Sequence, residues 1–452
     1  KRLAMRIELN KPEILSQIIK QIAGKRLINP ITGITTDSRD CKPGDLYIAL
    51  IGNRSNGHDF LSKVDNINAS AALVSEENTN PHLKLQQIFV QDTNKALGII
   101  ANKWRKIFDI PIIAITGSNG KTSTKELLYH VLKEKYNVHA TEGNYNTSIG
   151  LPLSLLSLNE DHNISIIEMG ANQTGDIEYL CKIAEPTHGL ITNISSAHLE
   201  SFQSIENIIN TKGALFKYLK QGVSFINYAD ERIKSINAIG NKVTYGLNAS
   251  CDFPADIHHE DDGSIVLTID AQEIKTKSIN LSFAKNILAV SAVSVTLGVE
   301  WELLQEKVLT FHPPKGRCKV ITYNSITVID DTYNANLESC IAAIDYLNAF
   351  SGGGRRILVL GDMLELGEAS PSQHKKLGLK CSRATVDAVF TIGEEMLTTQ
   401  SAIRRVPINL HYDNSSDLIS SLKSQIQDND KILFKGSRGM KMEKIISGVF
   451  EK

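Results

Sequence analysis

The sequence predicts an α/β protein built from three domains, and three observations lead to this fold class. The chain has 452 residues, which is too long for one ordinary hydrophobic core. Apolar runs of strand length alternate with helical patterns, as in parallel sheets that carry helices on both faces. Prolines at Pro111 and at Pro313–Pro314 mark boundaries. We therefore expect domains over residues 1–108, 109–313 and 314–452.

Each block contains its own set of elements. The first mixes short strands and helices and ends in a helix over 93–108. In the second block we expect apolar strands at 164–169 and 189–194, helices at 177–184 and 288–297, and a polar β-rich stretch at 249–281. In the third we expect strands at 326–329, 356–360, 388–392 and 431–434 and helices at 338–348, 371–384, 415–427 and 440–449.

Composition excludes several classes of protein. A net charge of −1, with 42% hydrophobic and 22% charged residues, is typical of a soluble globular protein. No basic tract favours nucleic acid, and no apolar run is long enough for membrane insertion. The first five residues lack the apolar core of a signal peptide. Six scattered cysteines without a Cys-x-x-Cys pair indicate reduced thiols, so we expect a cytoplasmic protein.

The segment from Ile113 to Ser123 has the pattern of a nucleotide phosphate loop. A β-branched run enters Gly117-Ser118-Asn119-Gly120-Lys121-Thr122 and a helix follows. Glycines let backbone N–H groups approach phosphate oxygens, Lys121 can reach the β- and γ-phosphates, and the Thr122 hydroxyl suits Mg²⁺. Only two residues separate the glycines, so the loop is a shortened variant of the usual one. A plain strand-to-helix turn is the alternative.

Polar side chains follow three of the predicted strands. Ligands of open α/β sheets bind beyond the carboxyl ends of the strands. Glu168 ends one strand and can hold Mg²⁺ opposite the phosphate loop, unless it is an ordinary loop residue. His198 follows the next strand, but a single histidine without further evidence is more often a surface residue than a ligand. Lys212, considered by itself, would be a solvated lysine on a helix.

The third block contributes another crowded strand end, Asp330 to Asn336. Two acids and two amides there suit ribose hydroxyls and a purine edge, with a structural turn as the alternative. Arg317 lies on the linker after Pro313–Pro314. From there it could reach a phosphate when the domains close.

Together these motifs resemble the Mur ligases, three-domain ATP-dependent enzymes that form amide bonds in peptidoglycan synthesis. The resemblance covers the chain from about residue 30, in the right order. The motifs of the central block are Thr116–Thr122, Glu168–Asn172 and Asn193 to Glu200. The first block resembles a UDP-binding domain through residues 36–39, 43–50 and 57–60. Residues 143–153, 331–336, 360–368 and 435–440 resemble the branch of the family that adds D-alanyl-D-alanine.

The resemblance implies a fold and a reaction. The fold is a small mixed α/β UDP-binding domain, a central P-loop-type domain with a parallel sheet, and a C-terminal Rossmann-like domain. The reaction adds D-alanyl-D-alanine to UDP-N-acetylmuramoyl-tripeptide through an acyl phosphate, with ATP, two Mg²⁺ ions and a carbamylated lysine at Lys212. The partners it implies are these small molecules, with no nucleic acid and no membrane insertion, and we expect a monomer.

The resemblance also implies residue roles. Catalytic residues would be Lys121, His198, Lys212 and Arg317. Metal ligands would be Thr122, Glu168, His198 and carbamylated Lys212. Nucleotide contacts would come from Thr116, Gly117, Ser118, Asn119, Gly120, Lys121, Thr122, Ser123, Asn286, Arg317, Asp331, Asn334 and Asn336. Substrate contacts would come from Ser38, Arg39, Asn144, Asn146 and Thr147.

Three alternatives stay open. The nearest is a Mur ligase that adds the third amino acid; such an enzyme often carries an Asp-Asn-Pro-Arg segment, which this sequence lacks. A ligase similar to folylpolyglutamate synthase is disfavoured by the motifs of the first block. The third alternative is a non-catalytic protein, a nucleotide-dependent scaffold, and the implied set of metal ligands argues against it.

Overall fold

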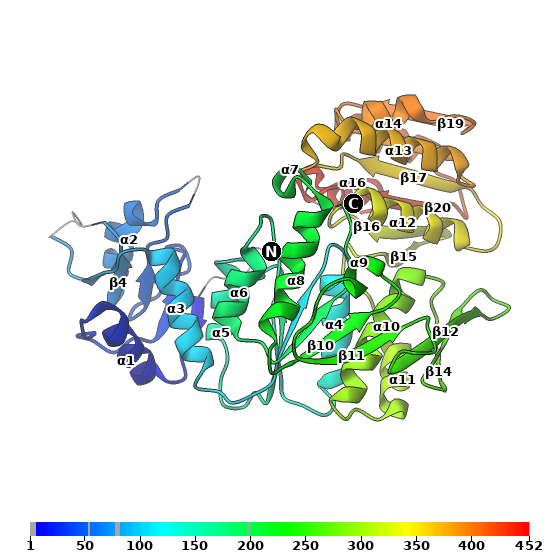
Figure 1. Cartoon of the computed structure of the whole chain (residues 1–452). Helices are drawn as coiled ribbons and strands as arrows, with labels where there is room; N and C mark the ends of the chain where they lie inside the picture. The colour runs from blue at the N-terminus through cyan, green and yellow to red at the C-terminus, as the bar shows by residue number, and fades with distance from the viewer. Residues whose placement is uncertain (1–5, 53–54, 77–81, 197–198, 452) are drawn as a thin grey trace.

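A computed structural model describes residues 6–52, 55–76, 82–196 and 199–451. The chain forms three lobes, each built around its own sheet (Figure 1). Among the described residues, no helix is both long and apolar enough to cross a membrane.

The first lobe carries a five-stranded sheet in the order β1-β2-β3-β4-β5. Its elements are β1 (Arg6–Glu8), α1 (Pro12–Ala23), β2 (Gly33–Thr35), β3 (Leu46–Ile48), η1 (Gly57–Phe60), α2 (Leu61–Asn66), β4 (Ala71–Val74), β5 (Gln86–Phe89) and α3 (Thr93–Arg105). Only β1 pairs in the antiparallel sense. The mixture of short strands and helices predicted for this block is confirmed.

The second lobe carries a nine-stranded sheet in the order β14-β13-β12-β11-β10-β9-β6-β8-β7. Its strands are β6 (Ile112–Thr116), β7 (Val138–Ala140), β8 (Ile164–Glu168), β9 (His188–Ile191), β10 (Val223–Asn227), β11 (Asn241–Gly246), β12 (Phe253–His259), β13 (Ile265–Ile269) and β14 (Gln272–Lys275). Its helices are α4 (Lys121–Leu132), α5 (Gly150–Leu156), α6 (Asp176–Ala184), α7 (Leu199–Phe202), α8 (Ile205–Tyr218), α9 (Glu231–Lys234), α10 (Leu281–Thr296) and α11 (Trp301–Thr310).

This central sheet is mixed rather than purely parallel. The strands from β7 to β12 run parallel, and β12, β13 and β14 are antiparallel neighbours at one edge. The antiparallel edge coincides with the polar β-rich stretch predicted over 249–281. Helices cover both faces, because β6 contributes Ala114 to one hydrophobic cluster with α5, α6 and α8, and Ile113 to another with α4, α10 and α11.

The third lobe has a six-stranded sheet in the order β15-β16-β20-β17-β18-β19. Its strands are β15 (Lys319–Tyr323), β16 (Ile326–Asp331), β17 (Arg356–Gly361), β18 (Ala388–Ile392), β19 (Ile408–Tyr412) and β20 (Lys431–Lys435). Its helices are α12 (Leu337–Ala349), η2 (Gly367–Ala369), α13 (Ser370–Arg383), α14 (Met396–Ala402), α15 (Ser415–Gln425), η3 (Arg438–Met440) and α16 (Glu443–Phe450). Only β15 is antiparallel to its neighbour.

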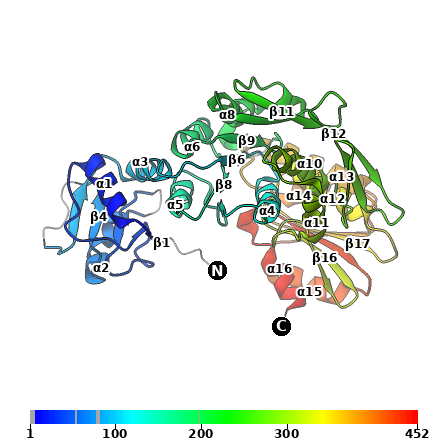
Figure 2. The same cartoon turned by 90° about the horizontal axis from the view of Figure 1, so that it is seen from below.

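Helix α3 joins the first lobe to the second. It packs against α5 and α6, and the Trp104 indole N–H donates to the Leu158 carbonyl at 3.1 Å. Figure 2 shows the first lobe set to one side, with α3 and α5 between its sheet and the central one. The carboxyl ends of β6, β8, β9 and β16 carry the polar motifs singled out in the sequence.

Candidate active site

The phosphate loop lies against the carboxyl end of β9. Ser118 N donates to the Asn193 carbonyl at 2.9 Å, and the Thr192 hydroxyl donates to the Asn119 carbonyl at 2.6 Å. Gly117 has φ +148°, and a Cβ there would lie 2.0 Å from Thr192 Oγ1, so this close approach requires glycine. Gly120, with φ +81°, is the N-cap residue of α4. No side chain of a described residue caps α4, which leaves its first N–H groups for an anion.

Two side chains of the loop region that were predicted to contact the nucleotide donate to backbone carbonyls of the protein. Thr116, predicted to bind nucleotide, is fully buried, and its hydroxyl donates to the Met169 carbonyl at 2.8 Å. Its side chain therefore ties β6 to the segment after β8. Lys121 Nζ donates to the Gly117 carbonyl at 2.7 Å, which folds the side chain back over the loop. Burial lowers the pKa of Lys121, Glu168 opposes that shift and Arg317 adds to it.

Glu168 and Thr122 form the oxygen-rich side of the site. Glu168 is 2% exposed; its Oε2 accepts from the Thr122 hydroxyl at 2.9 Å and its Oε1 from Asn146 Nδ2 at 2.7 Å. A carboxylate beside a hydroxyl suits Mg²⁺, which commonly takes one or two carboxylates and completes its shell with water and phosphate oxygens. Within the described ranges no cluster of three His, Cys, Asp or Glu side chains could hold a metal. These donors fit an ion that is shared with a nucleotide.

Lys212 is a buried lysine on α8, only 4% exposed. Burial, reinforced by the nearby charge of Lys121, lowers its pKa to about 7. The amine is therefore largely neutral at mildly alkaline pH, which is unusual for lysine. His198, the other predicted ligand of this region, lies outside the described residues.

The second and third lobes meet across the phosphate loop. Arg317 Nη2 donates to Thr122 Oγ1 at 3.1 Å, and Asn336 Nδ2 donates to Asn119 Oδ1 at 2.7 Å. Asn336 is also the N-cap of α12, because its side chain accepts from Ser339 N at 2.9 Å. One side chain thus caps a helix of the third lobe and contacts the loop of the second.

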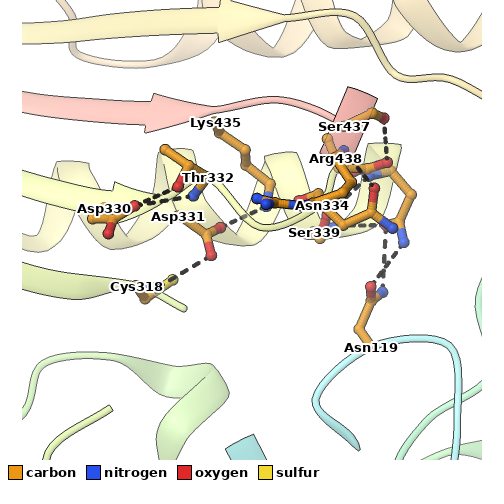
Figure 3. A network of polar contacts seen from close by, with 12 residues as sticks. Asn119, Cys318, Asp330, Asp331, Thr332, Asn334, Ser339, Lys435, Ser437 and Arg438 are labelled. Carbon is orange, nitrogen blue, oxygen red and sulfur yellow. Dashed lines mark hydrogen bonds and ion pairs between the residues drawn. The ribbon is translucent and has the colours of Figure 1, made fainter. Parts of the chain in front are cut away.

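A second polar network lies beside these contacts, at the ends of β16 and β20 (Figure 3). Lys435, 2% exposed, pairs with Asp331 Oδ2 at 2.5 Å, and its Nζ donates to the Asn334 carbonyl at 3.0 Å. Asp331 Oδ1 accepts from Cys318 N at 3.1 Å. Asp331 raises the pKa of Lys435 against the opposing effect of burial, so the pair is an ion pair.

A cavity of about 1080 Å³ opens between the two lobes. It is lined by the loop residues 118–124, by Glu168, and by side chains of the third lobe that include Arg317, Asp331 and Asn336. The lining also includes Asn286 and apolar residues, among them Leu247, Ile257, Phe283 and Phe311. The cavity thus combines groups that can bind phosphate with apolar side chains of the kind that accommodate a purine ring.

Family models match all three lobes. They are described as Mur ligase family, catalytic domain (residues 30–105), Mur ligase middle domain (115–294) and Mur ligase, glutamate ligase domain (316–438). The chain is 34% identical to the UDP-N-acetylmuramoyl-tripeptide–D-alanyl-D-alanine ligase of Synechocystis sp., over 92% of this chain and 91% of that protein. The chain belongs to the Mur ligase family.

Other relatives are similar along their full length to this Mur ligase. The Bacillus subtilis ligase with the same name is 32% identical, over 93% of both chains. A crystal structure of MurF from Acinetobacter baumannii aligns with a TM-score of 0.86 at 28% identity, over 97% of this chain and 98% of that one. MurF from Thermotoga maritima in complex with ADP aligns with a TM-score of 0.83 at 30% identity, over 92% and 96%.

Most residues predicted for the site of this Mur ligase line the cavity between the second and third lobes. They are Ser118, Asn119, Gly120, Lys121, Thr122, Ser123, Asn144, Asn146, Thr147, Glu168, Asn286, Arg317, Asp331, Asn334 and Asn336. Thr116, Gly117 and Lys212 are not among the lining residues within the described ranges. Ser38 and Arg39 lie in the first lobe, where Ser38 is buried and Arg39 pairs with Asp37 at 2.7 Å. Their predicted substrate contacts stay predictions.

Tyr333 and Lys435 line the cavity of this Mur ligase without having been predicted as site residues. Both belong to motifs that carry the family resemblance. A signal for Lys435 was present, because it ends β20, which pairs in parallel with β16. Parallel neighbours deliver their carboxyl ends to the same edge.

Proposed function

We propose that this chain catalyses the ATP-dependent ligation of D-alanyl-D-alanine to UDP-N-acetylmuramoyl-tripeptide. ATP, the tripeptide nucleotide and the dipeptide give ADP, phosphate and UDP-N-acetylmuramoyl-pentapeptide, a peptidoglycan precursor. The observation that carries the proposal is the cavity that the phosphate loop and Glu168 share with Arg317 of the third lobe. The full-length similarity to ligases of this name supports the choice of substrates.

The first chemical step activates the terminal carboxylate of the tripeptide. A carboxylate oxygen attacks the γ-phosphorus, the bond to the β-phosphate oxygen breaks, and an acyl phosphate and ADP result. The N–H groups at the start of α4 and the Lys121 ammonium would hold the phosphates, and Arg317 would face the transferred group. When bound, Mg²⁺ would be held by Thr122 and Glu168 and would neutralise phosphate charge.

The second step forms the amide bond. The neutral dipeptide amine attacks the acyl carbonyl and a tetrahedral intermediate forms. Phosphate then leaves with the bonding electrons of the C–O bond, and the amine nitrogen releases one proton to the departing phosphate or to water. Since water would hydrolyse the acyl phosphate, exclusion of solvent is part of the task, and the contacts of Arg317 and Asn336 with the phosphate loop hold the two lobes together beside the cavity.

The proposal includes a carbamylated Lys212. Carbon dioxide reacts with a neutral amine, and the resulting carbamate presents two oxygens to a hard cation. A buried lysine whose pKa is lowered to about 7 meets the first requirement at physiological pH. The role of His198 as a ligand, the cytoplasmic location expected for an ATP-dependent enzyme, and the monomeric state stay predictions.

The test is an assay of the purified chain with ATP, Mg²⁺, UDP-N-acetylmuramoyl-tripeptide and D-alanyl-D-alanine. We expect phosphate release only when acceptor and dipeptide are both present, together with the pentapeptide product in mass spectra. Turnover of the muramoyl-dipeptide with a single amino acid would instead identify a ligase for the third residue. ATP binding without turnover under any of these conditions would favour a scaffold and overturn the proposal.

A further inference from the structure

Arg317 lies in a segment that is held on both of its sides. Gly316 N donates to Asp330 Oδ2 at 3.0 Å, and Cys318 N donates to Asp331 Oδ1 at 3.1 Å. Two consecutive carboxylates at the end of β16 therefore fix the two chain neighbours of Arg317. These bonds set where the backbone of Arg317 lies, but they leave its long side chain undetermined.

The side chain is placed by Tyr333. The guanidinium carbon of Arg317 lies 3.8 Å from the centroid of the Tyr333 ring, which is van der Waals contact with an aromatic face. Tyr333 N also donates to the Gly316 carbonyl at 3.1 Å, so the ring and the arginine belong to one locally closed unit. Gly316 has φ +78°, and a Cβ there would lie 3.3 Å from Tyr333 Cβ.

Electrostatics explain why such a support is needed. The Arg317 charge lowers the pKa of Lys121, which shows that the two cations repel one another at the phosphate loop. Among the described residues, the hydrogen bond that aims the Arg317 side chain at this loop goes to a neutral hydroxyl, Thr122 Oγ1. Without another attraction, an arginine with many rotamers would turn toward solvent. The negative face of the Tyr333 ring offsets that tendency.

We propose that Tyr333 is a positioning residue that holds the Arg317 guanidinium toward the transferred phosphoryl group. The inference rests on the function proposed above and adds a residue to its machinery. The proposed role depends on the aromatic face of Tyr333, over which the Arg317 guanidinium lies. Among the described residues the Tyr333 hydroxyl makes no hydrogen bond that would explain a tyrosine here, so phenylalanine supplies a matched control.

The experiment compares Tyr333→Leu with Tyr333→Phe in the full chain, with ATP, Mg²⁺, the muramoyl tripeptide and the dipeptide. We expect Y333F to keep the kcat of the unaltered protein and Y333L to lose about tenfold in kcat. We expect the KM for ATP to change by less than about threefold, because Arg317 would act on charge that develops during transfer. An equal loss of kcat in Y333F would assign the role to the hydroxyl, and KM values that rise together in Y333L would indicate a packing defect, so either result overturns the inference.

A double-mutant cycle with Arg317→Ala makes the test specific. If Tyr333 acts through Arg317, adding Y333L to R317A has no further effect on kcat. Equal loss in both backgrounds, or full activity of Y333L, overturns the inference. Failure of the unaltered protein to turn over would overturn the proposed function instead, so the two failures are distinguishable. Melting temperatures of all variants check that each one folds.

Discussion

At the scale of single residues, Lys212 has an environment at odds with its charge. It is 4% exposed, and its pKa is lowered to about 7 by burial and by Lys121. If Lys212 carries the carbamate proposed above, we expect Lys212→Ala to lose about 100-fold in kcat, since losing a group that supports a metal site costs up to this much. Short carboxylic acids should restore part of the activity by supplying the missing carboxylate. Steady-state phosphate release with and without added acetate or propionate measures this effect.

The matched control for this prediction is Lys125→Ala. Lys125 is also buried, but its Nζ donates to the Thr141 carbonyl at 2.6 Å and pairs with Glu126. Its loss should reduce stability without any response to added acids. Full activity of K212A, or equal rescue of both variants, would rule out a carbamate at Lys212.

At the scale of elements, β7 and α5 are joined by a buried histidine. His139 Nδ1 lies 2.8 Å from the Ser165 hydroxyl and Nε2 lies 2.9 Å from the Ser154 carbonyl. Burial, with a smaller effect of His162, lowers the pKa of His139 to about 4. In the unfolded chain the pKa is about 6.5, so the unfolded state takes up the proton first as the pH falls. The free energy of unfolding therefore falls between about pH 6.5 and pH 4 as far as it depends on His139.

Urea unfolding followed by circular dichroism at pH 7 and pH 5 tests this prediction. The unaltered protein should lose about 2 kcal/mol between the two pH values through this one group. His139→Gln should lose less, because glutamine has no charge to gain. His258→Gln, at an exposed position, should behave like the unaltered protein. A pH response of H139Q equal to that of H258Q would contradict the assignment.

The elements also show which parts of the fold a sequence can predict. Strands β8, β17, β18 and β20 are fully or almost fully buried and β-branched or leucine-rich, and the predicted ranges agree to within one residue. Strand β19 was not predicted, because it is a half-buried edge without a clear alternation. Helix α14 was not predicted either, because it is short and contains two threonines, which are weak helix formers. Local pattern predicts an element when burial is strong and fails where the environment is mixed.

At the scale of the whole molecule, the site depends on how the second and third lobes are placed. Strand ends identified Glu168 and Asp331, because each position depends only on its own sheet. The contacts of Arg317 with Thr122 and of Asn336 with Asn119 join different sheets, and no local pattern encodes them. Further bonds between the lobes run from Ser196 N to Glu338 and from Glu200 N to the Glu365 carbonyl. The phosphate loop is therefore coupled to the third lobe by polar contacts.

Asn336 allows that coupling to be separated from helix stability. Asn336 and Asn414 are both N-caps, of α12 and α15, and accept from backbone N–H groups at 2.9 and 3.0 Å. Replacing either by alanine should cost about 1 kcal/mol, seen as a lower urea midpoint. Only N336A also removes the contact with Asn119, so only N336A should raise the KM for ATP, by about tenfold. Equal ATP kinetics in N336A and N414A would show that the loop works independently of the third lobe at this point.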